Sequence, residues 1–352
     1  MNSNVRKSNM ELLRIISMSM VVAIHLNGAW TYANGYGSFD FTSLHGFSLM
    51  LYQAFIIVAV NCFILISGYF GIKPSKKGIC SFLAYIIFYA LLCFGIGNLI
   101  GTTDFSFRKL AACFFHIDKQ LWFVSTYLIL YLLSHFINKG INALSNKKLI
   151  LITLIFTSLD ILGWVKGGSL LFDSYQINHM LTVYIIGRTL ARFKDRILPI
   201  SKKSKSILLA LFITCSFATA LLTIRFKYVF PMDYNSIFTL TASVAFFILF
   251  MSLNLQNRII NFIAGSAFSV YLLHQSSYTW STLLNFSQSM MNSLNEWTYN
   301  FVYIPITIIL LFAVTIPIDI VRRKVTNPFI KWAVKAINYL ENIICKFFKI
   351  ND

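Results

Sequence analysis

The sequence contains few acidic residues and few charged residues of any kind. Aspartate and glutamate together number 12 among 352 residues, and charged residues make up 12% of the chain, against roughly 25% in ordinary soluble domains. A soluble domain of this length needs far more charge on its surface, so the composition excludes an ordinary globular protein. The chain is instead 57% hydrophobic, with a mean hydropathy of +0.69. We therefore expect a polytopic membrane protein.

Several common site motifs are also missing. The sequence contains no phosphate-binding P-loop, no GxSxG nucleophile elbow and no HExxH zinc motif. The cysteines form no CxxC pair and lie mostly in apolar segments, which indicates small hydrophobic side chains and neither a disulfide framework nor a metal site. They are Cys62, Cys80, Cys93, Cys113, Cys215 and Cys345. We expect no metal cofactor.

Basic residues, by contrast, are abundant. Lysine and arginine number 30, which gives a formal net charge of +18. Such a charge can indicate nucleic-acid binding, but the basic residues lie in short clusters between apolar segments, as they do in cytoplasmic loops of membrane proteins. No basic stripe is interleaved with stacking aromatic side chains in a soluble segment. We therefore expect the chain to associate with a lipid bilayer and not with nucleic acid.

Ten apolar segments are candidates for transmembrane helices, each of which needs about 20 residues. They are residues 11–30, 47–70, 79–100, 120–138, 148–165, 178–192, 206–224, 235–254, 260–281 and 299–321. With the N-terminus inside, most lysine and arginine residues fall in cytoplasmic segments, as the positive-inside rule requires. The outer loops then hold Arg108, Lys109, Lys119, Lys166, Arg225 and Lys227. The predicted fold is all-α, with about ten transmembrane helices and both termini in the cytoplasm.

Two segments outside these ten are amphipathic. Residues 101–119 contain FSFRKLAACFFHIDKQ, whose apolar residues suit a short helix lying in the outer interface. Pro328 begins a segment with apolar residues on one helical face and lysine or asparagine on the other, which suits the anionic inner leaflet. We therefore divide the chain into a transmembrane domain of residues 1–325 and a cytoplasmic, membrane-anchoring tail helix of residues 326–352.

The first apolar segment carries ionisable residues. It reads NMELLRIISMSMVVAIHLNGAW and includes Glu11, Arg14 and His25. Arg14 and His25 are eleven residues apart, so they share one stripe of a helix, separated by about 16 Å along its axis, and Glu11 is spaced to pair with Arg14. Two interpretations remain. Either Glu11 and Arg14 reach the headgroups from the helix end while His25 lies near the far interface, or the stripe lines a polar cavity, where intramembrane charges usually lie.

The same segment resembles a known family. Its ELLRIISMSMVVAIH is similar to the first helix of the membrane-bound acyltransferase family 3, whose signature is an arginine and a histidine separated by ten residues, here Arg14 and His25. Three further stretches resemble family segments in the same order: NCFILISGYF at 61–70, QLWFVSTYLILYLL at 120–133 and FSVYLLHQSS at 268–277. The resemblance covers about residues 5–325. His135 departs from it, since relatives often carry proline there.

The resemblance implies an integral membrane enzyme that moves an acyl group, usually acetyl from acetyl-CoA, onto a hydroxyl of a cell-surface or capsular polysaccharide or its lipid-linked precursor. It places the chain in a cell membrane, as a multi-pass protein of the bacterial plasma membrane. We expect His25 to act as a base at neutral pH or to carry the acyl group transiently. Arg14, paired with Glu11, is expected to bind the donor's phosphates near the cytoplasm. A transporter or flippase for a glycan or lipid is the alternative, and it would need no acyl donor.

Four other residues are predicted to contact the substrate. His274 lies in the outer part of the ninth segment, where it can share the site or contact the acceptor. Tyr271 precedes it in the same motif. Trp122 either lines the cavity or belongs to an aromatic belt, and His116 in the outer loop is the candidate for which an interfacial position is the main alternative.

Structural roles are predicted for residues near these motifs. Ser67 and Gly68 are expected to allow close approach of two helices rather than to act in catalysis. His179 stands at the start of a predicted helix and is expected at the membrane interface. The sequence leaves the acceptor sugar, the acyl chain and the oligomeric state open.

Overall fold

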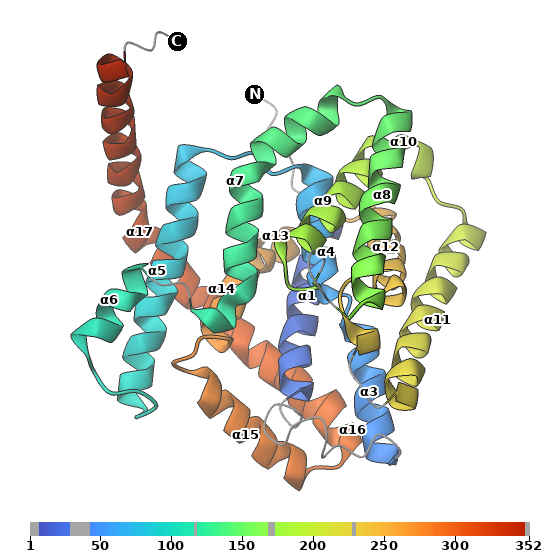
Figure 1. The fold of residues 1–352 in the computed structure, drawn as a ribbon. Helices are drawn as coiled ribbons and strands as arrows, with labels where there is room; N and C mark the ends of the chain where they lie inside the picture. The colour runs from blue at the N-terminus through green and yellow to red at the C-terminus, as the bar shows by residue number, and fades with distance from the viewer. Residues whose placement is uncertain (1–6, 29–42, 116–117, 168–172, 227–229, 349–352) are drawn as a thin grey trace.

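The computed structural model describes residues 7–28, 43–115, 118–167, 173–226 and 230–348, and these residues form helices with no strand among them (Figure 1). The all-α prediction is confirmed. In chain order the elements are α1 (Ser8–Asn27), α3 (Leu44–Ile56), α4 (Ala59–Phe70), α5 (Lys76–Leu99), α6 (Phe107–Phe115), η2 (Lys119–Leu121), α7 (Trp122–Ala143), α8 (Asn146–Val165), α9 (Ile177–Arg192), α10 (Lys194–Ile197), α11 (Lys202–Phe226), η3 (Phe230–Met232), α12 (Ile237–Met251), α13 (Arg258–Ala264), α14 (Ala267–His274), α15 (Trp280–Ser293), α16 (Glu296–Thr298), η4 (Tyr299–Tyr303) and α17 (Ile304–Phe348).

Six helices in the described part of the chain are long and apolar enough to cross a membrane, which confirms a multi-pass membrane protein. They are α1, the consecutive pair α3 and α4, α5, α8, α11 and the long helix that includes α17. Three other predicted segments correspond to α7, α9 and α12, which have 22, 16 and 15 residues. The predicted segment at 260–281 is divided between α13 and α14. The number of ten transmembrane helices stays a prediction.

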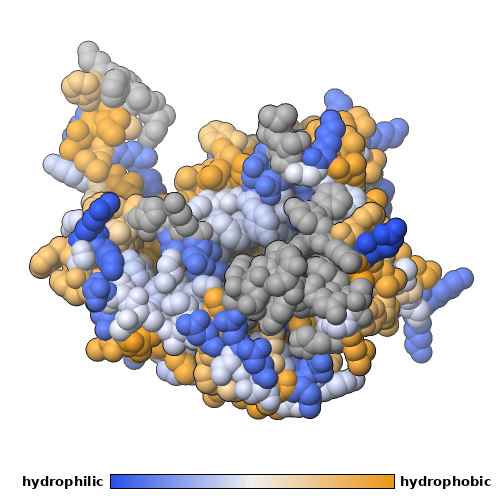
Figure 2. All heavy atoms as spheres, turned by 60° about the horizontal axis from the view of Figure 1, so that its bottom comes forward, coloured by the Kyte–Doolittle hydropathy of each residue, from blue (hydrophilic) through white to orange (hydrophobic). Residues whose placement is uncertain are grey.

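One end of the bundle gathers basic segments. The starts of α1, α5 and α8, together with α10 and the C-terminal part of α17, lie toward the upper side of Figure 1. These segments carry basic residues such as Lys76, Lys147 and Lys194, and we call this side the basic end. Figure 2 turns the opposite end toward the viewer, where polar and weakly hydrophobic residues lie beside patches of hydrophobic ones. That the basic end faces the cytoplasm stays a prediction.

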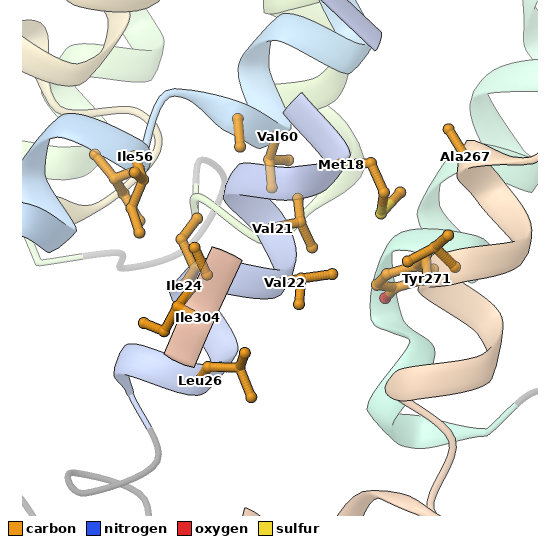
Figure 3. Close-up of a cluster of buried hydrophobic side chains, with 14 of the residues drawn as sticks. Met18, Val21, Val22, Ile24, Leu26, Ile56, Val60, Ala267, Tyr271 and Ile304 are labelled. Atoms are coloured by element: carbon orange, nitrogen blue, oxygen red, sulfur yellow. The ribbon is translucent and has the colours of Figure 1, made fainter. Parts of the chain in front are cut away.

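Helix α1 lies at the centre of the packing. It contacts α3, α4, α12, α13, α14 and α17. Figure 3 shows its Met18, Val21 and Val22 in a cluster of buried side chains shared with Tyr271 of α14. Between helices in lipid, such contacts stabilise through van der Waals packing more than through water exclusion. A helix surrounded in this way is apolar on nearly every side, so its few ionisable residues must be held inside the protein.

Helices α4 and α9 approach each other at two glycines. A Cβ added to Gly68 would lie 3.0 Å from Cα of Gly187, and a Cβ added to Gly187 would lie 2.7 Å from the carbonyl oxygen of Leu65. Such contacts leave no room for a side chain, and small residues are what allow membrane helices to approach this closely. The packing role predicted for Gly68 is confirmed.

The amphipathic segments are both helical. Helix α6 lies within the predicted interfacial segment and exposes Phe107 and Phe115. Helix α17 continues without interruption through Pro328, and its C-terminal part projects from the bundle in Figure 1. Ile330 packs there against Cys80 and Ala84 of α5. The helical form of the tail is therefore as predicted, while its separation as a domain and its membrane anchoring stay predictions.

Candidate active site

Two histidines from distant parts of the chain meet between α1 and α14. His25 lies in the last turn of α1, and His274 is the last residue of α14. Nδ1 of His25 lies 2.9 Å from Nε2 of His274, and the ring centroids are 5.1 Å apart. His274 is buried. The chain brings these two rings together across 249 residues, so their contact is a property of the tertiary fold.

The second nitrogen of His274 determines how protons are arranged in this pair. Nδ1 of His274 lies 2.6 Å from the carbonyl oxygen of Val270. A carbonyl oxygen can only accept a hydrogen bond, so Nδ1 of His274 carries a proton and donates it. In a neutral ring Nε2 is then an acceptor, and the proton between the two rings belongs to Nδ1 of His25. Nε2 of His25 is left with a lone pair.

The neutral state of both rings follows from their surroundings. Among the described residues, the hydrogen-bond partners of His25 and His274 include no carboxylate. A charge without a partner is costly in an apolar interior. Neutral imidazole at His25 can therefore accept a proton or attack a carbonyl carbon through Nε2.

A cavity adjoins His25 and includes two more of the predicted residues. Its lining contains His25, Trp122 and Tyr271, with Phe123 and Phe268 among the other walls. Trp122 stacks on Tyr234, with ring centroids 6.0 Å apart, and the Tyr271 and His274 rings meet edge to face at 6.0 Å. The structure thus brings His25, His274, Trp122 and Tyr271 into one neighbourhood. Their catalytic and substrate-binding roles stay predictions.

Glu11 and Arg14 form the expected ion pair nearer the basic end. Nη1 of Arg14 donates to Oε2 of Glu11. Glu11 is buried, so it does not reach toward the headgroups, whereas the Arg14 side chain is 29% exposed. Arg14 also lies within electrostatic range of Tyr127, whose ring stacks on Phe123 at 5.6 Å between centroids. This geometry favours the interpretation in which the Arg14–His25 stripe faces the interior of the bundle.

Two residues near the histidines were not found from the sequence. Trp280 meets His25 edge to face, with ring centroids 5.7 Å apart, and its position shortly after His274 was the available signal. The role of the Val270 carbonyl cannot be predicted from the sequence, because every residue has a backbone carbonyl whatever its side chain. His116 lies outside the described residues.

His179 is buried inside the helix bundle, while its depth at the membrane interface stays a prediction. It is 2% exposed, with Nδ1 at 2.8 Å from Oδ2 of Asp160 and Nε2 at 2.9 Å from Oδ1 of Asn61. The Asn61 amide nitrogen donates to the carbonyl of Tyr234, which fixes its oxygen toward His179. Nε2 of His179 therefore donates to Oδ1 of Asn61, and Nδ1 shares a hydrogen bond with the Asp160 carboxyl group. This buried network joins α4, α8 and α9.

Comparison with known proteins identifies a family. Residues 7–316 match the model of a family described as an acyltransferase domain. The match covers nearly the whole chain and includes both α1 and α14. No match was found among curated proteins or among solved structures.

Proposed function

The chain belongs to acyltransferase family 3, and on that basis we propose that it is an O-acetyltransferase of a bacterial plasma membrane. The donor is acetyl-CoA from the cytoplasm. The acceptor is a hydroxyl of a cell-surface or capsular polysaccharide or of its lipid-linked precursor. Family membership supports acyl transfer in a membrane, while the donor, the acceptor and the orientation are parts of the proposal.

One observation carries this proposal, namely the hydrogen-bonded series from Val270 through His274 to His25. It leaves a lone pair on Nε2 of a neutral imidazole. A sugar hydroxyl is a weak nucleophile until a base accepts its proton, and a positioned base typically contributes about 10²–10⁴-fold to the rate. His25 also lines a cavity with aromatic walls, which suits a reaction that must exclude water.

The proposed reaction transfers one acyl group and one proton. Nε2 of His25 accepts the proton of the acceptor hydroxyl while the hydroxyl oxygen attacks the thioester carbonyl. The carbon–sulfur bond then breaks, and the CoA sulfur leaves as a thiol after receiving that proton from His25. In the second route, Nε2 attacks the thioester first, the carbon–sulfur bond breaks, and CoA leaves as the thiolate. The acyl group then passes from His25 to the hydroxyl, whose proton goes to the thiolate and leaves free His25 and CoA thiol. Both routes need the same free lone pair.

Mass spectrometry of surface glycans tests the function. Cells with and without the gene are grown with deuterium-labelled acetate, and glycan esters are quantified by their labelled acetyl mass. We expect labelled O-acetyl groups only in cells that carry the gene. Glycans with equal acetylation in both strains, or export that depends on the gene without any change in acetylation, would contradict the proposal and favour a transporter.

A further inference from the structure

A second cavity lies on the basic side of the bundle, away from His25. It is an open cavity lined by α5, α7 and α17, with a volume of about 600 Å³. The residues that line it include Tyr85, Tyr127, Tyr131, Arg322 and Arg323. The two arginines fall after the last predicted transmembrane segment. The cavity therefore places two cations beside aromatic side chains, and guanidinium groups suit phosphate oxygens.

A buried carboxylate holds both arginines in place. Asp319 has 0% exposure and accepts from Nε of Arg322 at 2.7 Å and from Nε and Nη2 of Arg323 at 2.9 and 2.6 Å. Ser266 and Ser269 each donate to it at 2.9 Å. Two cations surround one anion, so the cluster keeps a net positive charge. Their side chains are already fixed, so a bound anion would not have to order them.

Arg322 in particular presents unpaired donors to this cavity. The residue is 7% exposed, and its guanidinium carbon lies 3.7 Å from the centre of the Tyr85 ring. Only its Nε has a hydrogen-bond partner among the described residues. Nη1 and Nη2 therefore remain available to a ligand in this cavity. A bound phosphate would pair both.

The second cavity and the cavity at His25 share a wall of stacked aromatic rings. Tyr127 and Phe82 line the second cavity, whereas Phe123 and Phe268 line the first. Phe123 stacks on Tyr127 with an interplanar angle of 15°, and Phe82 stacks on Phe268 with an angle of 16°. An extended ligand with a charged end in the second cavity could therefore reach His25 by displacing rings that contact both spaces.

We propose that Arg322 and Arg323 bind the phosphate esters of the nucleotide half of the acyl donor in this second cavity. The proposal rests on acyl-CoA being the donor, as proposed above. It assigns the phosphate contacts to the end of α17, in addition to Arg14 on α1. The thiol-bearing arm, which is uncharged, then extends past Tyr127 toward His25.

Binding of coenzyme A and of pantetheine, which lacks the nucleotide and its phosphates, tests this assignment. Purified protein in zwitterionic nanodiscs is titrated calorimetrically as wild type, Arg322→Lys and Arg323→Gln. Arg322→Lys keeps the charge opposite Asp319, so the fold is preserved while the planar fork is lost. We expect each variant to weaken coenzyme A binding by about tenfold or more and to leave pantetheine binding within about twofold. Lys324→Gln is the matched control, because Lys324 is exposed on the same helix and does not line the cavity.

Each other outcome identifies a different error. If wild-type protein binds coenzyme A and both variants bind it equally well, the subsite is wrong while the proposed function stands. If wild-type protein does not bind coenzyme A, both proposals fall. An anionic lipid headgroup offers the same phosphate chemistry, so the titrations are repeated with phosphatidylglycerol in the nanodiscs. Loss of coenzyme A binding to wild type in that lipid would assign the cavity to lipid and overturn the proposal.

Discussion

The chemistry of His25 depends on which of its ring nitrogens carries a proton. His274 fixes that proton on Nδ1, because its own Nδ1 is committed to the carbonyl of Val270. The Arg14–His25 spacing was readable from the sequence, since eleven residues in a helix return to the same stripe. The contact between His25 and His274 could not be predicted in the same way, because no local pattern specifies a contact between side chains 249 residues apart.

His274 is therefore expected to act as a positioning residue. His274→Leu removes the acceptor for Nδ1 of His25, and we expect kcat to fall by about 10²-fold or more because the wrong tautomer becomes populated, with the donor KM unchanged. His274→Gln offers an amide oxygen in its place and should recover part of that loss. Steady-state kinetics of the purified variants make the measurement, with exposed His135→Gln as the control. A wild-type kcat in His274→Leu would exclude this role.

Arg14 is expected to act on donor binding rather than on the chemical step. Arg14→Ala should raise the acetyl-CoA KM by about tenfold, because one charge-assisted hydrogen bond to the donor is lost. Arg14→Lys should restore the KM only in part, because lysine lacks the planar fork of the guanidinium group. Since Arg14→Ala leaves the buried Glu11 unpaired, the double variant Glu11→Gln/Arg14→Ala serves as the fold control. An unchanged donor KM in both alanine variants would rule out the assigned role.

At the scale of helices, the sequence predicts where apolar helical segments lie better than it predicts where a helix is interrupted. The segment at 260–281 is apolar throughout, so hydropathy predicts one helix, yet the chain divides it into α13 and α14. The break sits at Gly265 and Ser266, and it makes α14 a helix of 8 residues whose last turn carries His274. A Gly–Ser pair does not by itself predict the end of a helix. In the fold, the break at this pair accompanies the packing of α14 against α17 and the hydrogen bond from Ser266 to Asp319.

The α4–α9 contact gives a prediction on stability. Gly68→Ala places a methyl group against the backbone of α9, at Tyr184 and Gly187, and overpacking of this type costs about 1–3 kcal/mol. We expect a lower midpoint of thermal unfolding for the detergent-purified variant. Gly95→Ala in α5 is the control, because an added Cβ there meets nothing within 4 Å. Equal midpoints for the two variants would show that α4 and α9 are not closely packed at Gly68.

For the whole molecule, composition was enough to predict an all-α membrane protein, but not how many helices span the bilayer. Helix α9, with 16 residues, is about 24 Å long, which is shorter than the roughly 30 Å hydrocarbon core. Such a helix spans only where its ends are covered by neighbouring elements. Hydropathy along one segment contains no information on those neighbours, so topology needs a direct measurement.

Cysteine labelling from outside intact cells supplies that measurement. In a background with the six native cysteines replaced, single cysteines are introduced at 31–45, 282–298, 193–205 and the tail. We expect an impermeant maleimide to label the first two positions and to label the last two only after the membrane is opened, because basic segments remain inside. Labelling of the tail in intact cells would contradict an inward-facing basic end.

The rate of acetyl transfer by His25→Ala tests the central claim most directly. His25→Ala and wild-type protein are compared at matched abundance for labelled acetyl transferred to surface glycan. Because Nε2 of His25 is the proposed base or acyl carrier, we expect transfer to fall by at least about 10²-fold, with membrane insertion and thermal stability unchanged. Acetylation near the wild-type rate in a normally inserted His25→Ala protein would contradict the claim and assign the base elsewhere.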